Sequence, residues 1–174
     1  MRRFSPLALV LLAACSSSES SPPDGSVSEG GSDAAADAPI ADAGTEASIT
    51  SDCVAKINAY RAKVSAPPVG SKSDEIACAT DQATKGAEDL ADSGTTVFHK
   101  YFGECSESYQ NECWYSVDDP DAVIDWCLDA FWQEGPPDTG INHYSVMTDP
   151  KSTEVACGLF HMPAGGYWMT NDYY

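Results

Sequence analysis

Apolar residues recur every three or four positions in three stretches of the chain after residue 50. This spacing is typical of amphipathic helices. A Pro-Pro pair ends the first stretch, Ser-Gly ends the second, and an Asp-Pro cap begins the third. The sequence therefore predicts helices over about 53–66, 75–93 and 120–134.

Beyond residue 142, aromatic and β-branched residues become frequent and the pattern changes to one typical of strands. The predicted strands cover 143–147, 155–162 and 166–173, with turn signals between them. Three helices followed by a short antiparallel sheet predict an α+β fold with the helices packed on the sheet. Residues 97–116 are rich in cysteine and aromatic residues and have no clear period. We expect them to form a disulfide-pinned loop with at most one short strand.

At the N-terminus, two arginines precede a short apolar run at 7–12, and Leu-Ala-Ala stands directly before Cys15. This pattern resembles the signal peptide of a bacterial lipoprotein. The run is far shorter than the roughly 20 residues of a membrane-spanning helix. The resemblance implies that residues 1–14 are removed, that Cys15 is lipidated, and that the lipid anchors the protein in a membrane. An ordinary secretory signal with an unrelated cysteine is the alternative. Because Ser16 follows the cysteine, the resemblance favours the outer membrane of a Gram-negative bacterium.

Residues 16–50 consist mainly of Ser, Ala, Asp, Gly and Pro, with seven acidic residues and no basic one. Such a segment buries too little apolar surface to offset its ordering entropy, so we expect a disordered acidic tether. Residues 51–174 then form one domain, and their number supports a single hydrophobic core.

The charge is strongly negative, with 27 acidic and 9 basic residues and a formal net charge of −18. Seven of the acids lie in the tether and two of the bases in the signal peptide, which leaves −13 for residues 51–174. This balance argues against binding to nucleic acid or to anionic lipid surfaces. It favours solubility and attracts cations.

Six cysteines follow Cys15, and an even number behind an export signal predicts three disulfides. The sequence does not choose among the pairings. The six are Cys53, Cys78, Cys105, Cys113, Cys127 and Cys157.

The three histidines of the chain all lie in the predicted domain. His161 alternates with Phe160 in a predicted strand, and we interpret it as structural. His99 and His143 each stand at the boundary of a predicted element, close to carboxylates. Two imidazoles and two carboxylates in one cleft suit a divalent cation such as zinc, or a general acid–base pair. The alternative is that His99 caps a helix and His143 bonds within the sheet.

Four short motifs follow one another along the predicted domain. They are INAYR at 57–61 with PPV at 67–69, His99 before Cys105-Ser106-Glu107, FWQE at 131–134, and NHY at 142–144 before VACG at 155–158. In this order they resemble the CAP superfamily, also called SCP domains, of cysteine-rich secretory proteins, antigen 5 and pathogenesis-related proteins. That family opens with a helix carrying an Asn-x-Tyr-Arg motif and then a Pro-Pro pair. It continues with a histidine before Gly-Glu-Asn, Trp-x-x-Glu on the third helix, and Gly-His-Tyr before a Cys-Gly strand.

The resemblance covers about 53–174 and implies a three-layer α-β-α sandwich with a central cleft. It also implies that His99, Glu107, Glu134 and His143 line this cleft, and that the two histidines take Zn²⁺ or another divalent cation. Glu112 is a rival to Glu107, because Asn111-Glu112 also resembles part of Gly-Glu-Asn.

A second rival lies on the third helix. Trp126 to Asp129 also fits Trp-x-x-acid, but Glu134 is closer in sequence to His143 and immediately precedes a Gly-Pro-Pro break. We therefore expect Glu134 in the cleft.

Membership of such a family does not fix an activity. The first hypothesis is an extracytoplasmic lipoprotein whose cleft binds a divalent cation and a small or lipidic ligand. The second is a hydrolase in which a histidine or metal activates water and a glutamate acts as base. The third is a disulfide-stapled module that binds a protein partner and has no working cleft. No Gly-x-Ser-x-Gly motif is present, so a serine nucleophile is not favoured.

Overall fold

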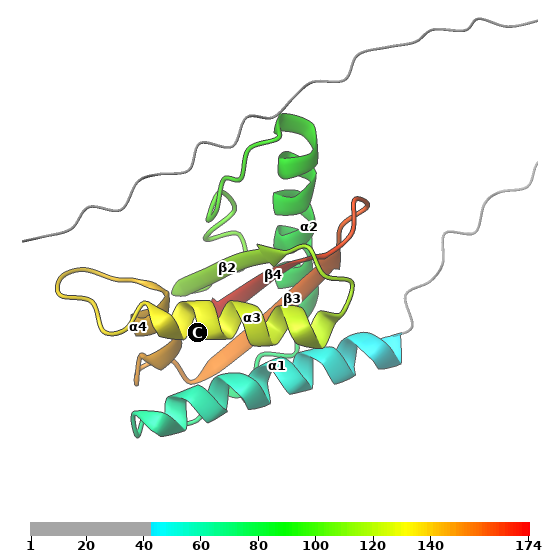
Figure 1. Cartoon of the computed structure of the whole chain (residues 1–174). Helices are drawn as coiled ribbons and strands as arrows, with labels where there is room; N and C mark the ends of the chain where they lie inside the picture. Colours follow the sequence, from blue (N-terminus) through cyan, green and yellow to red (C-terminus); the bar gives the residue numbers. More distant parts are fainter. Residues whose placement is uncertain (1–42) are drawn as a thin grey trace, which may run out of the picture. The chain divides into compact units, whose positions relative to one another are not determined.

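The computed structural model describes residues 43–174, and their side chains from residue 49 onward. The predicted signal peptide, Cys15 and residues 16–42 of the predicted tether lie outside this range. The described residues contain four helices and four strands (Figure 1). The helices are α1 (Ala43–Lys63), α2 (Ile76–Ser93), α3 (Pro120–Gln133) and α4 (His143–Thr148). The strands are β1 (Gly70–Ser71), β2 (Tyr109–Tyr115), β3 (Glu154–His161) and β4 (Tyr167–Tyr173).

The four strands form one mixed sheet in the order β1-β3-β4-β2. β4 pairs antiparallel with both β3 and β2, so the C-terminal strand is the centre of the sheet. The predicted antiparallel sheet is therefore present, and the two-residue β1 adds a parallel edge beside β3.

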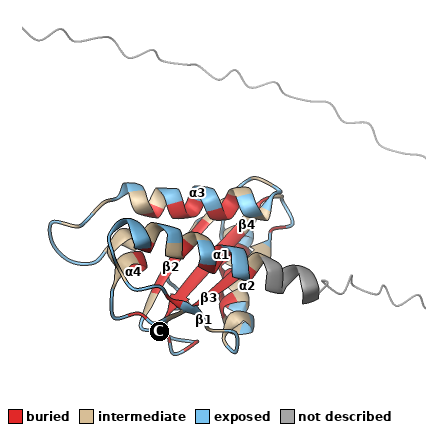
Figure 2. Cartoon of the chain, turned by 90° about the horizontal axis from the view of Figure 1, so that it is seen from below, coloured by how far each residue is buried: buried red, intermediate tan, exposed pale blue. Residues whose placement is uncertain are grey.

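Helices cover both faces of the sheet, and this confirms the predicted α+β sandwich. α1, α3 and α4 pack on one face, where the main core includes Ile57, Leu128 and Tyr173 (Figure 1). α2 packs on the other face, where a smaller core joins its alanines to Trp168. Buried residues accordingly concentrate in the strands and in the helix faces turned toward them (Figure 2).

Three disulfides confirm the predicted cysteine framework and add its pairing. Cys53–Cys157 joins α1 to β3, and Cys113–Cys127 joins β2 to α3. Cys78–Cys105 joins α2 to the segment before β2. Each bridge therefore links a helix to another part of the fold rather than closing a local turn.

The segment at 143–147 is a helix, and the prediction of a strand there was wrong. Asn142 caps α4, because its side-chain oxygen accepts a hydrogen bond from the Ser145 N–H at 2.9 Å. The Ser145 hydroxyl accepts one from the Asn142 N–H at 3.0 Å. This capping box starts a helix in a sequence whose composition favours a strand.

Residues 97–116 form the expected disulfide-pinned segment, and the one strand that was allowed there is the seven-residue β2 in its C-terminal half. The first helix also begins earlier than Cys53, since α1 already includes residues 43–52. Neither α1 nor any other helix within residues 43–174 is long and apolar enough to cross a membrane.

Candidate functional site

The fold brings together His99 and His143, which lie far apart in the sequence. His99 belongs to the segment between α2 and β2, and His143 is the first residue of α4. Their ring centroids are 5.8 Å apart, and the ring planes are inclined by 29°. His143 also stacks on Phe131 of α3, with the centroids 4.7 Å apart. The two imidazoles therefore form a pair whose position is supported by the end of α3.

Glu134, at the C-terminal end of α3, holds His143 through two hydrogen bonds. One carboxylate oxygen accepts the His143 backbone N–H at 2.9 Å. The other oxygen lies 2.6 Å from Nδ1 of the same residue. An ionised carboxylate only accepts hydrogen bonds, so Nδ1 carries the proton and Nε2 keeps its lone pair in the neutral ring.

Glu112 accepts the backbone N–H of His99, as Glu134 accepts that of His143. It lies on β2, and only 3% of its surface is exposed. Its carboxylate accepts the backbone N–H of His99 and, at 3.3 Å, the hydroxyl of Thr170. Burial raises the pKa of Glu112, and the hydrogen bond from His99 partly opposes this shift. His99 has a φ of 60°, a left-handed conformation that few non-glycine residues adopt.

Glu107 does not line the cleft, contrary to the prediction, and of the two histidines His143 lines it while His99 lies exposed beside it. Its buried carboxylate accepts hydrogen bonds from the Gly103 and Cys105 N–H groups and from the amide of Gln82. These bonds hold it in the segment before β2. The structure instead places the rival Glu112 beside His99. The only sequence signal for Glu112 was the neighbouring Asn111, which resembles the family's Gly-Glu-Asn.

The other expected residues occupy different places. Asp129 is exposed on α3 and lies near the Gln133 amide rather than in the cleft. His161 is exposed and has Asp118 as its partner, 3.0 Å from its Nε2. His161 thus has the surface position that its strand pattern predicts.

A cleft of about 500 Å³ lies between β2 and α3, beside the histidine pair. Five aromatic residues give it largely apolar walls, and one end is polar because Glu112, Glu134 and His143 line it. Trp126 and Tyr115 stack face to face, with the ring centroids 4.5 Å apart. The aromatic residues are Phe98, Trp114, Tyr115, Trp126 and Phe131. The cleft is therefore amphipathic, with an apolar body and a carboxylate-rich end.

Two residues of the first-helix motif have structural roles away from the cleft. The Asn58 side chain exchanges two hydrogen bonds with the Val69 backbone, at 2.8 and 2.9 Å. Arg61 is fully buried and donates to four backbone carbonyl oxygens. This motif therefore fastens the C-terminal end of α1 to the loops beside it.

Residues 54–173 match the model of the cysteine-rich secretory protein family, CAP. The chain belongs to the CAP family. No curated protein matches the chain significantly. The match spans the CAP domain from α1 to β4, and so includes the cleft and both histidines.

The spacing of the two imidazoles in this CAP domain is compatible with two ligands of one divalent ion. Zinc–nitrogen bonds of about 2.1 Å place two ligating imidazole centres roughly 5–6 Å apart. The 5.8 Å between the His99 and His143 centroids agrees with this requirement. Glu134 supplies the carboxylate partner that metal-binding histidines commonly have on their second nitrogen.

Within the described residues, two groups of three side chains place potential metal donors within 4.8 Å of one another, and neither contains a histidine. They are Glu75, Cys78 and Cys105, and Cys105, Glu107 and Asp172. Both include sulfur of the Cys78–Cys105 disulfide. A disulfide sulfur is not the thiolate that binds zinc, so the histidine pair is the better candidate.

Proposed function

We propose that the protein is an extracytoplasmic lipoprotein whose CAP-domain cleft binds a divalent cation through His99 and His143. The observation that carries this proposal is the pairing of the two imidazoles, 5.8 Å apart, in which His143 lines the polar end of the cleft. Zinc suits such nitrogen ligands, with Glu112 and Glu134 supplying negative charge nearby. The cation would act as a Lewis acid that attracts an anionic or hydroxyl group of a ligand.

The shape and lining of the cleft support an amphipathic ligand, of small or lipidic type. Aromatic side chains line the long walls between β2 and α3, and ionisable groups gather at one end. Apolar area buried against such walls contributes about 25 cal/mol per Å². The ligand's apolar body would lie along the aromatic walls, and its polar head would face the histidine pair.

Removing either imidazole is expected to abolish cation binding. Zinc is titrated calorimetrically into the full chain with its disulfides intact, beside His99→Ala and His143→Ala. A two-ligand site loses most of its affinity with one ligand, so we expect each variant to bind at least about 100-fold more weakly. His161→Ala is the matched control and should bind zinc as the wild type does. Equal binding by the wild type and both variants would rule out this site.

Lipid anchoring through Cys15 is supported by the sequence pattern before it. Cys15→Ser is expected to move the protein from the membrane fraction to the soluble fraction of cells that process lipoproteins. The cysteine thiol is the acceptor of the lipid, and serine lacks it. Retention of the variant in membranes would contradict the proposal.

A further inference from the structure

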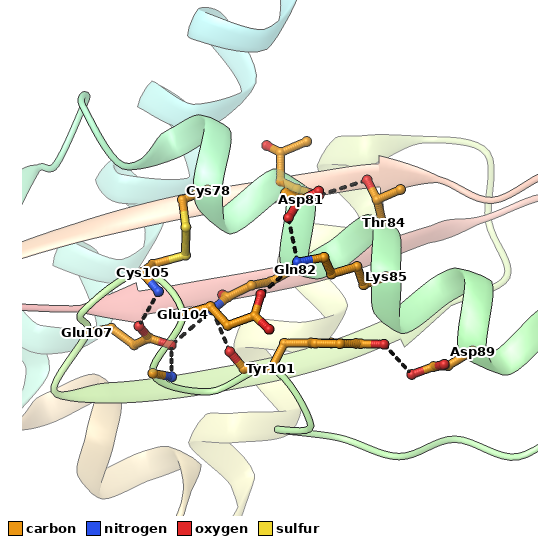
Figure 3. A network of polar contacts seen from close by, with 12 residues as sticks. Cys78, Asp81, Gln82, Thr84, Lys85, Asp89, Tyr101, Glu104, Cys105 and Glu107 are labelled. Carbon is orange, nitrogen blue, oxygen red and sulfur yellow. Dashed lines mark hydrogen bonds and ion pairs between the residues drawn. A yellow bond between two sulfur atoms is a disulfide. The ribbon is translucent and has the colours of Figure 1, made fainter.

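A chain of side-chain hydrogen bonds leads from the exposed His99, beside the candidate cleft, into the buried layer between α2 and the sheet. Its members are His99, Gln110 on β2, Gln82 on α2, Glu107 and Asp172 on β4. Gln82 and Asp172 are fully buried, and Glu107 and Gln110 are each 6% exposed. The amide of Gln82 points toward the Glu107 carboxylate and the Tyr101 carbonyl (Figure 3).

At the inner end of this hydrogen-bond chain, the donor and acceptor atoms are fixed. The Gln82 Nε2 lies 2.9 Å from the Tyr101 carbonyl oxygen and 3.0 Å from a Glu107 carboxylate oxygen. A carbonyl and an ionised carboxylate only accept hydrogen bonds, so the Gln82 nitrogen must face them. The Gln82 oxygen is therefore turned toward Gln110. Backbone N–H groups of Gly103 and Cys105 hold the Glu107 carboxylate in place.

The bonds of Gln110 extend this direction of hydrogen bonding to His99. Its Nε2 donates to the Gln82 oxygen at 2.9 Å and to an Asp172 oxygen at 3.1 Å. Its own oxygen consequently faces the Nδ1 of His99, at 3.2 Å. Since an amide oxygen only accepts, Nδ1 must be the protonated nitrogen of the neutral ring. The Nε2 of His99 is left with its lone pair.

We propose that Gln110, oriented by Gln82, Glu107 and Asp172, is a positioning residue that fixes His99 as the Nδ1–H tautomer. The tautomer follows from the network itself, and its value for cation binding rests on the proposed function of the cleft. His143 reaches the same tautomer through direct contact with Glu134. On the His99 side, the Gln82 and Gln110 amides connect the buried Glu107 carboxylate to the ring. The acceptor for the ring is therefore an uncharged amide oxygen, and no further charge lies beside the cleft.

The arrangement at Asp172 supports this role. Burial, with the nearby Glu107, Glu112 and Glu75 carboxylates, raises the pKa of Asp172 to about 8. A carboxyl group in either protonation state keeps an oxygen that accepts the Gln110 N–H. The orientation of Gln110 is therefore held on both sides of neutral pH.

The test is the ¹⁵N spectrum of the histidine rings in the metal-free full chain, above the pKa of the imidazoles. We expect His99 of the wild type to carry its proton on Nδ1. Finding the proton on Nε2 would overturn the proposal without any variant.

Two substitutions at one position separate positioning from a merely structural role. Gln110→Met removes the acceptor and should release His99 into a mixture of tautomers, with zinc affinity lowered about 10–100-fold. Gln110→Glu loses the same donor bonds to Gln82 and Asp172 but keeps an acceptor for His99, so it should retain the Nδ1–H form. An unchanged tautomer in Gln110→Met would overturn the proposal. Absence of zinc binding in the wild type would reject the cation site, and the ring spectra would still decide the role of Gln110.

Discussion

Gly158→Ala is expected to lower the free energy of unfolding by at least about 3 kcal/mol, at the upper end of what overpacked cores show. A Cβ at Gly158 of β3 would lie 2.2 Å from the carbonyl carbon of Ala79 and 2.4 Å from the Thr80 nitrogen. Both atoms belong to the backbone of α2, so no change of rotamer relieves the contact. The helix would have to move off the sheet, and Gln82 would move with it.

Chemical denaturation of the oxidised full chain measures this effect. Gly70→Ala is the matched control, because a Cβ there meets nothing closer than 3.9 Å. We expect Gly70→Ala to unfold within about 1 kcal/mol of the wild type, as surface substitutions usually do. If Gly158→Ala were as stable as Gly70→Ala, the close seating of α2 on β3 would be wrong.

Arg61→Met is the second substitution with a large expected effect, about 3–5 kcal/mol of unfolding free energy. Arg61 is fully buried, and burial lowers its pKa. Its guanidinium donates to the carbonyls of Pro67, Met147, Asp149 and Ser152 at 2.7–3.2 Å. Methionine fills similar space but donates nothing, so these oxygens would lose their shared donor.

Arg61→Lys tests whether the planar geometry of the guanidinium is needed in addition to its charge. A single ammonium cannot reproduce the planar fork of the guanidinium, so Arg61→Lys should also destabilise the protein, though less than methionine does. Lys63→Met, on the exposed end of the same helix, should have little effect. Equal stability of Arg61→Met and Lys63→Met would show that the four hydrogen bonds contribute nothing measurable.

The elements that were predicted well are those with strong local signals. α2 ends before Gly94, which has the left-handed φ of 65° that a glycine cap provides. α3 starts at Pro120 behind the Asp119 cap, as the Asp-Pro pair predicts. In both cases the residues that end or start the helix act within one turn, so neighbouring sequence is sufficient.

β2 was predicted only as one possible short strand within residues 97–116, because its inward-facing residues on the α2 side are polar. Gln110 and Glu112 occupy positions where the alternation of a strand would require apolar side chains. Their burial is sustained by partners on α2, β4 and the loop carrying His99, which the sequence places far away. The residues that break the apolar pattern are the ones that build the candidate site.

Contacts between distant parts of the sequence also explain why Glu112, rather than the expected Glu107, lies beside His99. Both glutamates follow His99 within residues 97–116, where the sequence has no clear period. Only the pairing of β2 with β4 decides which of them lies beside the imidazole. Glu134 and His143 were easier to predict, because a short connection joins the end of α3 to the start of α4.

The Cys113–Cys127 bridge has a consequence for how a ligand is selected. Cys113 directly follows Glu112, and Cys127 lies on the helix that ends before Glu134, so the bond ties one wall of the cleft to the other. The slot cannot widen by drawing β2 and α3 apart while this bond is intact. A ligand that fits would bind with little loss of conformational entropy in the protein, because the bridge already holds the cleft rigid. A bulkier ligand would be excluded by its shape, whatever its attraction to the polar end of the cleft.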